Sequence, residues 1–117
     1  MPRKEFIDLL IEDAEKRRRC FENYLRYAEK VKALVRRKDP NARIMVFGSV
    51  VRGDVRPDSD IDLLIITEIA EKLEERIGLR MEIMKILGEG STFETHIITA
   101  EEYESWYRRF IDRFLEL

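Results

Sequence analysis

Two pairs of residues in the middle of the chain have types and spacing that suit phosphate chemistry. Gly48 and Ser49 end one apolar segment, and Asp60 and Asp62 stand at the start of the next, residues 63–66. Because strand side chains alternate between faces, Asp60 and Asp62 should point to the same side. Paired carboxylates repel each other unless a cation neutralises them, and Mg²⁺ prefers oxygen ligands. Since glycine lets a backbone approach a phosphate and serine offers donors, the spacing predicts a magnesium–nucleotide site.

The spacing of the aspartates allows two other interpretations. Asp58, Asp60 and Asp62 alternate as at the start of an EF-hand calcium loop. That loop needs glycine at its sixth position and glutamate at its twelfth, where this chain has Leu63 and Ile69, so the calcium interpretation fails. A simple turn explains Asp58 but not Asp62, because an acid inside an apolar strand costs folding free energy unless something binds it.

The segment between the two motifs, residues 50–59, carries Arg52 and Arg56. It predicts a helical turn and a loop, with both arginine side chains facing the mouth of the predicted nucleotide site. Guanidinium groups bind phosphate oxygens in a fork geometry, so both arginines are candidate nucleotide-binding residues. A solvent-exposed loop charge is the alternative for each, and both interpretations stay open.

Read together, residues 47–65, FGSVVRGDVRPDSDIDLLI, resemble the signature of the DNA polymerase beta-like nucleotidyltransferase superfamily, and most of all its minimal nucleotidyltransferases. The resemblance implies an α/β fold like the polymerase beta palm, a small mixed β-sheet with helices packed on one face. It also implies transfer of a nucleoside monophosphate, with AMP from ATP as the first candidate, to a hydroxyl. Asp60 and Asp62 would hold two Mg²⁺ ions. Gly48 and Ser49 would bind the β- and γ-phosphates, with Arg52 as a phosphate clamp.

The third carboxylate that this superfamily usually supplies is the point where the chain departs from the pattern. In the predicted strand 93–98 the place of the acid falls on His96, and Glu94 precedes it on the same face. Glu94 could complete the metal cluster or act as the base. His96 could replace the acid, contact the acceptor or bind phosphate, but a lone histidine is also often a hydrogen-bonded structural residue. If neither reaches the metals, the protein would bind nucleotide without turning it over.

Partners follow from the same resemblance. Some minimal nucleotidyltransferases are antitoxins paired with a small helical HEPN-type toxin that they nucleotidylate or bind. The resemblance therefore implies a nucleoside triphosphate, ATP first, and a HEPN-type protein. The alternative function is a docking module of the same fold without catalysis. A homodimer is a further expectation, with the long first helix as a candidate interface.

Length and composition limit the number of domains, the partners and the compartment that we expect. At 117 residues we expect one domain, with a helical segment at 1–39 and a catalytic core at 42–117. The net charge of −2 does not favour nucleic acid as the main partner. The single cysteine, Cys20, fits a reducing cytoplasm, and no signal peptide or membrane span is expected. Many Glu and Lys residues and no Gln suggest a thermophilic source.

The periodicity of apolar residues predicts the order helix, strand, short helix, strand, helix, strand, helix. Residues 4–38 read as one long helix or as two with a kink, ended by Asp39 before Pro40. Thr67 should cap a helix from Glu68, and Thr99 should begin the last helix with a capping box. A fourth strand could lie near residues 79–83. The expected inner face of the helix after Thr67 consists of Ile69, Leu73, Ile77, Met81 and Met84. The expected apolar face of the last helix consists of Tyr103, Trp106, Tyr107, Phe110, Phe114 and Leu117.

Overall fold

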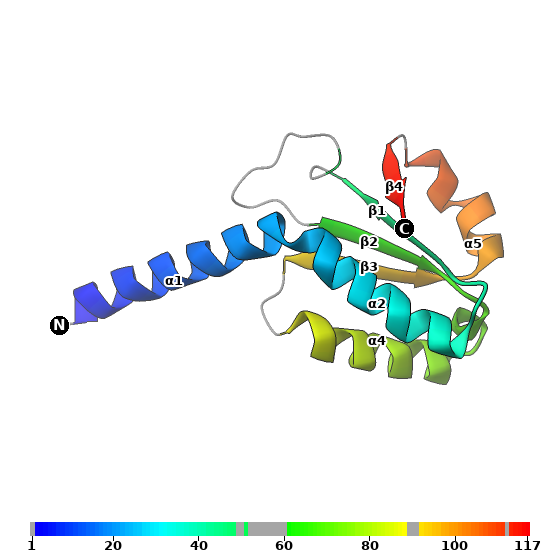
Figure 1. The fold of residues 1–117 in the computed structure, drawn as a ribbon, viewed down its shortest axis with the longest axis horizontal. Coiled ribbons are helices and arrows are strands. Elements are labelled where there is room, and N and C mark those ends of the chain that lie inside the picture. The colour runs from blue at the N-terminus through cyan, green and yellow to red at the C-terminus, as the bar shows by residue number, and fades with distance from the viewer. Residues whose placement is uncertain (1, 49–50, 52–60, 89–91, 112) are drawn as a thin grey trace.

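A four-stranded mixed sheet forms the centre of the molecule (Figure 1). The computed structural model describes residues 2–48, 51, 61–88, 92–111 and 113–117. The strands, in spatial order, are β3 (Phe93–Ile98), β2 (Ile61–Ile66), β1 (Arg43–Phe47) and β4 (Phe114–Glu116). β1 is antiparallel to β2 and β4, whereas β2 and β3 are parallel. This arrangement confirms the expected α/β class and small mixed sheet.

Two long helices cover one face of the sheet. They are α2 (Tyr24–Lys38) and α4 (Leu73–Leu87), which lie side by side in Figure 1. The main core joins alternate strand residues to the inner stripes of these helices, as the period of two in strands and 3.6 in helices requires. Its buried members include Val31 and Val35 of α2, Leu79 and Ile83 of α4, and Ile44, Val46, Leu63, Ile65 and Ile97 of the sheet.

The opposite face of the sheet is covered mainly at one end, by the short helix α5 (Ala100–Ser105) and the turn that follows it. There α5 packs Tyr103 against Leu64, Ile66 and Ile98. These strand residues lie in the middle and at the end of β2 and β3, so α5 leaves the beginnings of both strands free of helix. The expected fold had helices on one face, and the structure adds this partial cover on the other.

The predicted long first helix is two helices, which was one of the two expected outcomes. α1 (Pro2–Glu22) ends at Asn23, whose backbone is not helical, and α2 begins at Tyr24. α2 ends at Asp39, which is extended as expected before proline. The carboxylate of Asp39 is buried and accepts a hydrogen bond from the Thr67 hydroxyl over 2.7 Å. This bond joins the end of α2 to the end of β2.

The predicted inner face of the helix after β2 is wrong except for Ile69, which packs against the main core as expected. Thr67 caps the segment as expected, but only the 3₁₀ helix η1 (Glu68–Glu71) follows before Lys72 becomes extended. α4 then begins at Leu73, so the helical phase counted from Ile69 is lost at the break. Leu73, Ile77, Met81 and Met84 are all about half exposed or more, and the same helix buries Leu79 and Ile83 instead. The fourth strand expected at 79–83 is also wrong, because these residues belong to α4.

The last predicted helix is much shorter than its apolar pattern suggested. The Thr99 capping box is confirmed, with Glu102 as its second member. α5 ends at Ser105, the 3₁₀ helix η2 (Tyr107–Arg109) follows, and the chain then forms β4. Trp106, Phe110 and Phe114 are therefore mostly exposed rather than core residues.

The structure tests one further expectation only in part and does not test another. The short helix expected in residues 50–59 lies outside the described residues except for Val51, which is helical. The division into segments 1–39 and 42–117 stays a prediction. None of the described helices combines the length and the apolar character needed to cross a membrane.

Candidate active site

Asp62 lies at the open end of the second sheet face. It is the second residue of β2 and is paired in register with Phe47 on β1 and Glu94 on β3. Strand alternation puts His96, two residues after Glu94, on the same face. The Ile61 N–H donates to the Thr92 carbonyl over 2.7 Å, which aligns the beginnings of β2 and β3. The sheet itself therefore brings these side chains together.

Asp62, Glu94 and His96 form one compact group of possible ligands. One ligand atom from each lies within 4.8 Å of the others, and this is the single such group found among the described residues. His96 Nε2 is 3.5 Å from Asp62 Oδ1 and 3.9 Å from Glu94 Oε1. The side chains of Asp62 and His96 are each 21% exposed, and that of Glu94 is 58% exposed. Asp62 and His96 thus form the floor of the group, and Glu94 lies at its rim.

The His96 ring is held between two aromatic side chains. Its centroid is 5.7 Å from that of Phe47 and 5.6 Å from that of Tyr107, the latter in a T-shaped arrangement. Its buried Nε2 atom makes no hydrogen bond to any of the described residues, and the Asp62 carboxylate lies 3.5 Å from it. A buried nitrogen without a partner costs free energy unless a ligand satisfies it. This observation disfavours the interpretation of His96 as a hydrogen-bonded structural residue.

Gly48 packs directly against the Asp62 carboxylate. Its φ angle is +92°, a conformation that side-chain-bearing residues rarely adopt, and a Cβ atom at this position would overlap Asp62 Oδ2. The absence of a side chain therefore leaves the room that the carboxylate occupies. The expected contact of Gly48 with phosphate stays a prediction.

The group of Asp62, Glu94 and His96 fits a divalent cation by its chemistry. Two carboxylates and a neutral imidazole are common ligands of divalent ions, and the free Nε2 atom faces both carboxylates. Carboxylate oxygens suit Mg²⁺ and Mn²⁺, whereas imidazole suits Fe, Ni, Cu and Zn ions. The two carboxylates thus fit the ion that the sequence predicts, and His96 adds a nitrogen ligand that Mg²⁺ favours less.

Four predicted site residues lie outside the described part of the chain. They are Ser49, Arg52, Arg56 and Asp60. The expectation that Asp60 shares a face with Asp62, and the expected phosphate contacts of Ser49 and both arginines, stay predictions.

Phe47 and Tyr107 are site residues that the sequence interpretation missed as such. Phe47 belongs to the apolar segment that Gly48 and Ser49 end, and its place directly before Gly48 could have indicated it. Tyr107 was placed on a helix that ends before it, and its approach to His96 depends on the turn of the chain after α5. No local pattern encodes that contact.

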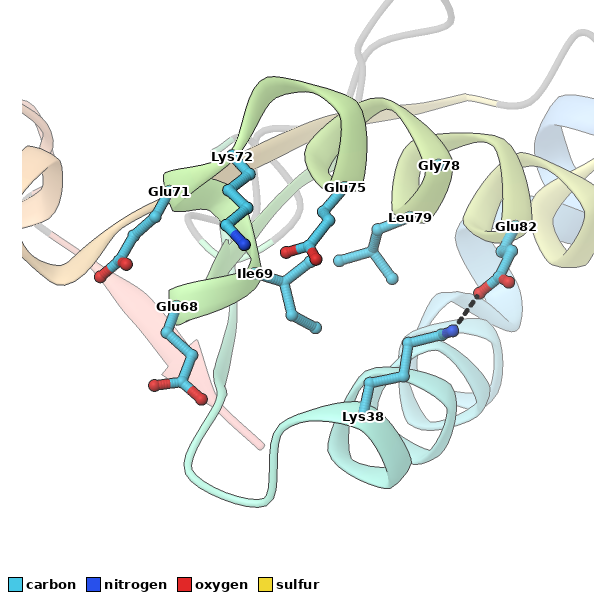
Figure 2. Close-up of a pocket in the computed structure, with 9 residues that line it drawn as sticks. All are labelled: Lys38, Glu68, Ile69, Glu71, Lys72, Glu75, Gly78, Leu79 and Glu82. Carbon is cyan, nitrogen blue, oxygen red and sulfur yellow. Dashed lines mark ion pairs between the residues drawn. The ribbon is translucent and has the colours of Figure 1, made fainter.

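A pocket of about 580 Å³ lies away from this group (Figure 2). It is formed by the end of α2, η1 and the first half of α4, near the end of β2 rather than its beginning. Lys38 crosses it to pair with Glu82 over 3.3 Å. Its lining residues are Lys38, Glu68, Ile69, Glu71, Lys72, Glu75, Gly78, Leu79 and Glu82, and none belongs to the predicted site.

Comparison with known proteins identifies the family. A model of the nucleotidyltransferase domain matches residues 28–114. The chain therefore belongs to the nucleotidyltransferase domain family. It resembles a crystal structure classed as a nucleotidyltransferase with 31% identity and a TM-score of 0.66, covering 76% of this chain and 95% of that one. This nucleotidyltransferase domain also shares its fold with a protein of that class from Sulfolobus solfataricus, at 20% identity and a TM-score of 0.54, with coverages of 89% and 85%. No protein with a curated description matches the chain. These findings confirm the predicted minimal nucleotidyltransferase.

Proposed function

We propose that this protein is an active, divalent-metal-dependent enzyme that transfers a nucleoside monophosphate, AMP from ATP first, to a hydroxyl group. The observation that carries the proposal is the meeting of Asp62, Glu94 and His96 beside Gly48, at the uncovered end of a nucleotidyltransferase sheet. Such a group on rigid strands suits a metal-bound triphosphate. Mg²⁺, as two ions, is the first candidate for the cofactor.

In this proposal the residues of the group have separate roles. Asp62 and His96, from the floor, hold the ion, which when bound would acidify the attacking hydroxyl and neutralise charge on the phosphates. Asp60 is proposed as the further metal ligand from its position in the sequence. Glu94 lies at the exposed rim, where it can take the acceptor proton or bind the ion from the solvent side.

The reaction is a substitution at phosphorus. The acceptor oxygen forms a bond to the α-phosphorus, the bond from that phosphorus to the bridging oxygen of the β-phosphate breaks, and pyrophosphate leaves. The acceptor proton passes to Glu94. Gly48 and Ser49 are proposed to bind the β- and γ-phosphates, with Arg52 and Arg56 neutralising their charge.

The acceptor is proposed to come from a partner protein of the HEPN type. The antitoxin role rests on the resemblance of the motif in residues 47–65.

The experiment that tests this proposal uses ATP labelled at the α-phosphate. The full chain is incubated with Mg²⁺ or Mn²⁺ and a purified HEPN-type protein, and label on protein is measured. We expect transfer of label by the wild type. With Asp62→Asn the rate of transfer should fall by more than the roughly 10–100-fold that is typical of losing a residue that only hydrogen-bonds to a metal ligand. Glu101→Gln, which removes an exposed carboxylate of α5, is the control and should transfer normally. Equal transfer by wild type and Asp62→Asn would contradict the proposal.

A docking module without catalysis is the second candidate, and one observation favours it. Leu73, Ile77, Met81 and Met84 form an exposed apolar stripe on α4, typical of a surface that another helix covers. If docking is the whole function, Met81→Glu abolishes binding of the HEPN-type protein. Asp62→Asn then leaves both binding and toxin neutralisation unchanged.

A further inference from the structure

Helix α1 projects from the domain with a large apolar surface in water. Figure 1 shows α1 extending away from the sheet, with the N-terminus at its far end. None of its described side chains belongs to either buried core, and it precedes the part of the chain, residues 28–114, that matches the family domain. Its exposed large apolar side chains are Phe6, Ile7, Leu9, Leu10 and Ile11, each at least 50% exposed.

A helix of this kind gains little stability by itself. Isolated helices are marginal in water, and most helical stability in proteins comes from packing of an apolar face. The apolar stripe of α1 continues the stripe with which α2 covers the sheet, at alternating steps of three and four residues. In α2 the sheet covers this stripe, whereas in α1 nothing within the described residues does.

Charge along α1 divides into two blocks of opposite sign. Residues 5–15 contain the acids Glu5, Asp8, Glu12, Asp13 and Glu15 and no base, and residues 16–19 are Lys-Arg-Arg-Arg. A parallel pair of such helices would set each block beside its own copy, which is repulsive. An antiparallel pair sets acids beside bases in both halves. Charge therefore selects one orientation for self-pairing.

We propose that α1 pairs with α1 of a second copy of this chain as an antiparallel coiled coil. The stripe positions fix the register of the two helices, because the steps of three and four residues between them come in the same order from either end. Two antiparallel copies can therefore align all of these positions. By position, Leu10 then lies opposite Phe21, and the small Ala14 opposite Arg17. Each such pair of facing positions occurs twice, because the two copies are related by a two-fold axis. Apolar positions therefore face apolar positions at both ends of the coiled coil.

The same charge pattern disfavours other occupants. A membrane surface is usually anionic and would repel the acids that surround the apolar residues 6–11. A different protein partner for α1 would leave the isolated chain monomeric, which sedimentation distinguishes.

Sedimentation of the full chain tests whether the pair forms. We expect a dimer whose dissociation constant rises at least about tenfold with Leu10→Glu, since a charge enters the apolar layer. Leu9→Glu is the matched control: Leu9 is 62% exposed against 54% for Leu10, but it lies off the stripe. It should change the constant less than about threefold. A monomer at about 100 µM, or equal effects of the two variants, would overturn the proposal.

Distances between spin labels test the orientation. In a Cys20→Ser background, single labels replace the exposed Glu5 or Glu15. In the antiparallel register the Glu15 labels lie side by side, and the Glu5 labels are roughly 30 Å apart along the axis at 1.5 Å per residue. Similar short distances at both positions indicate a parallel pair and overturn the register. Asp62→Asn should sediment as a dimer, so failure of the proposed function leaves this result unaffected.

Discussion

At the scale of single residues, the site depends on the contact between Gly48 and Asp62. Gly48 combines a positive φ with a position where any Cβ overlaps the carboxylate. Strain alone costs roughly 1 kcal/mol, but displacement of Asp62 also removes a proposed metal ligand. The two effects can be separated because the chain has another described glycine with positive φ.

We predict that Gly48→Ala loses Mn²⁺ binding whereas Gly88→Ala keeps it. Gly88 has a φ of +84°, close to the +92° of Gly48, but a Cβ atom on Gly88 would meet no neighbouring atom within 4 Å. Both variants should therefore lose stability from strain, of about 1–3 kcal/mol, and only Gly48→Ala adds an overlap with the Asp62 carboxylate. Calorimetric titration with Mn²⁺ and thermal unfolding measure the two effects. Equal metal affinity in the two variants would show that Asp62 is not a ligand.

His96 predicts a preference between metal ions. Since imidazole nitrogen suits Zn²⁺ whereas carboxylate oxygen suits Mg²⁺, the wild type should bind Zn²⁺ more tightly than Mg²⁺. His96→Asp restores the acid usual at this place in the family and should reduce the ratio of the two affinities by about tenfold. Titration calorimetry measures the ratio, and Tyr107→Phe, which keeps the ring beside His96, is the control. An unchanged ratio in His96→Asp would exclude His96 as a ligand.

At the scale of elements, β4 is the strand that the sequence interpretation missed. It has three residues, all exposed, and pairs with β1 from the far end of the chain. Arg43 on β1 donates two hydrogen bonds to the Glu116 carboxylate, over 2.9 and 2.8 Å. This pair ties the short edge strand to the sheet.

The same pair predicts a dependence of stability on pH. The hydrogen bonds from Arg43 hold the pKa of Glu116 below its usual value. A lowered folded-state pKa stabilises the fold above the unfolded-state pKa, and that stability is lost as pH falls through the lowered value. Glu116→Gln should therefore destabilise by up to about 1 kcal/mol at pH 7 and not at strongly acidic pH, because both partners are partly exposed.

Urea unfolding at several pH values measures this difference. Glu104→Gln is the control, because Glu104 pairs with Arg108 only four residues along the chain and ties no strand to the sheet. A loss of stability in Glu116→Gln that is constant over the whole pH range would contradict the assignment.

The elements that could be predicted from the sequence are those with local signals. The apolar runs of β1 and β2, the cap at Thr67 and the capping box at Thr99 all depend on neighbours within a few residues. The inner face of α4 depends on the break at Lys72. Strand β4 depends on pairing with Met45 of β1, which lies far away in the sequence. Of the site, strand alternation and the motif placed Asp62, Glu94 and His96, but the aromatic contacts of His96 came only from tertiary packing.

At the scale of the whole molecule, α1 and the nucleotidyltransferase domain are separable. The longest dimension of the molecule is 53 Å against 29 and 22 Å for the others, and Figure 1 shows that α1 accounts for the elongation. Among the described residues, the buried core begins at Ala28, after α1 has ended. The stability of the domain should therefore not depend on α1.

We predict that a fragment of residues 23–117 folds with the stability of the full chain. Its free energy of unfolding should differ by no more than about 0.5 kcal/mol, because no contact of the described core is removed. Urea denaturation at a concentration where the full chain is monomeric measures it. A loss of several kcal/mol would mean that α1 packs on the domain.

The metal group at the beginning of β2 and β3 carries the whole functional interpretation. Crystals grown with Mn²⁺ and a nonhydrolysable ATP analogue would locate the ion by its anomalous scattering. We predict a peak in contact with Asp62 and His96, next to the triphosphate and beside Gly48. Bound nucleotide with no peak there, or with the Asp62 and His96 side chains turned away from each other, would contradict it.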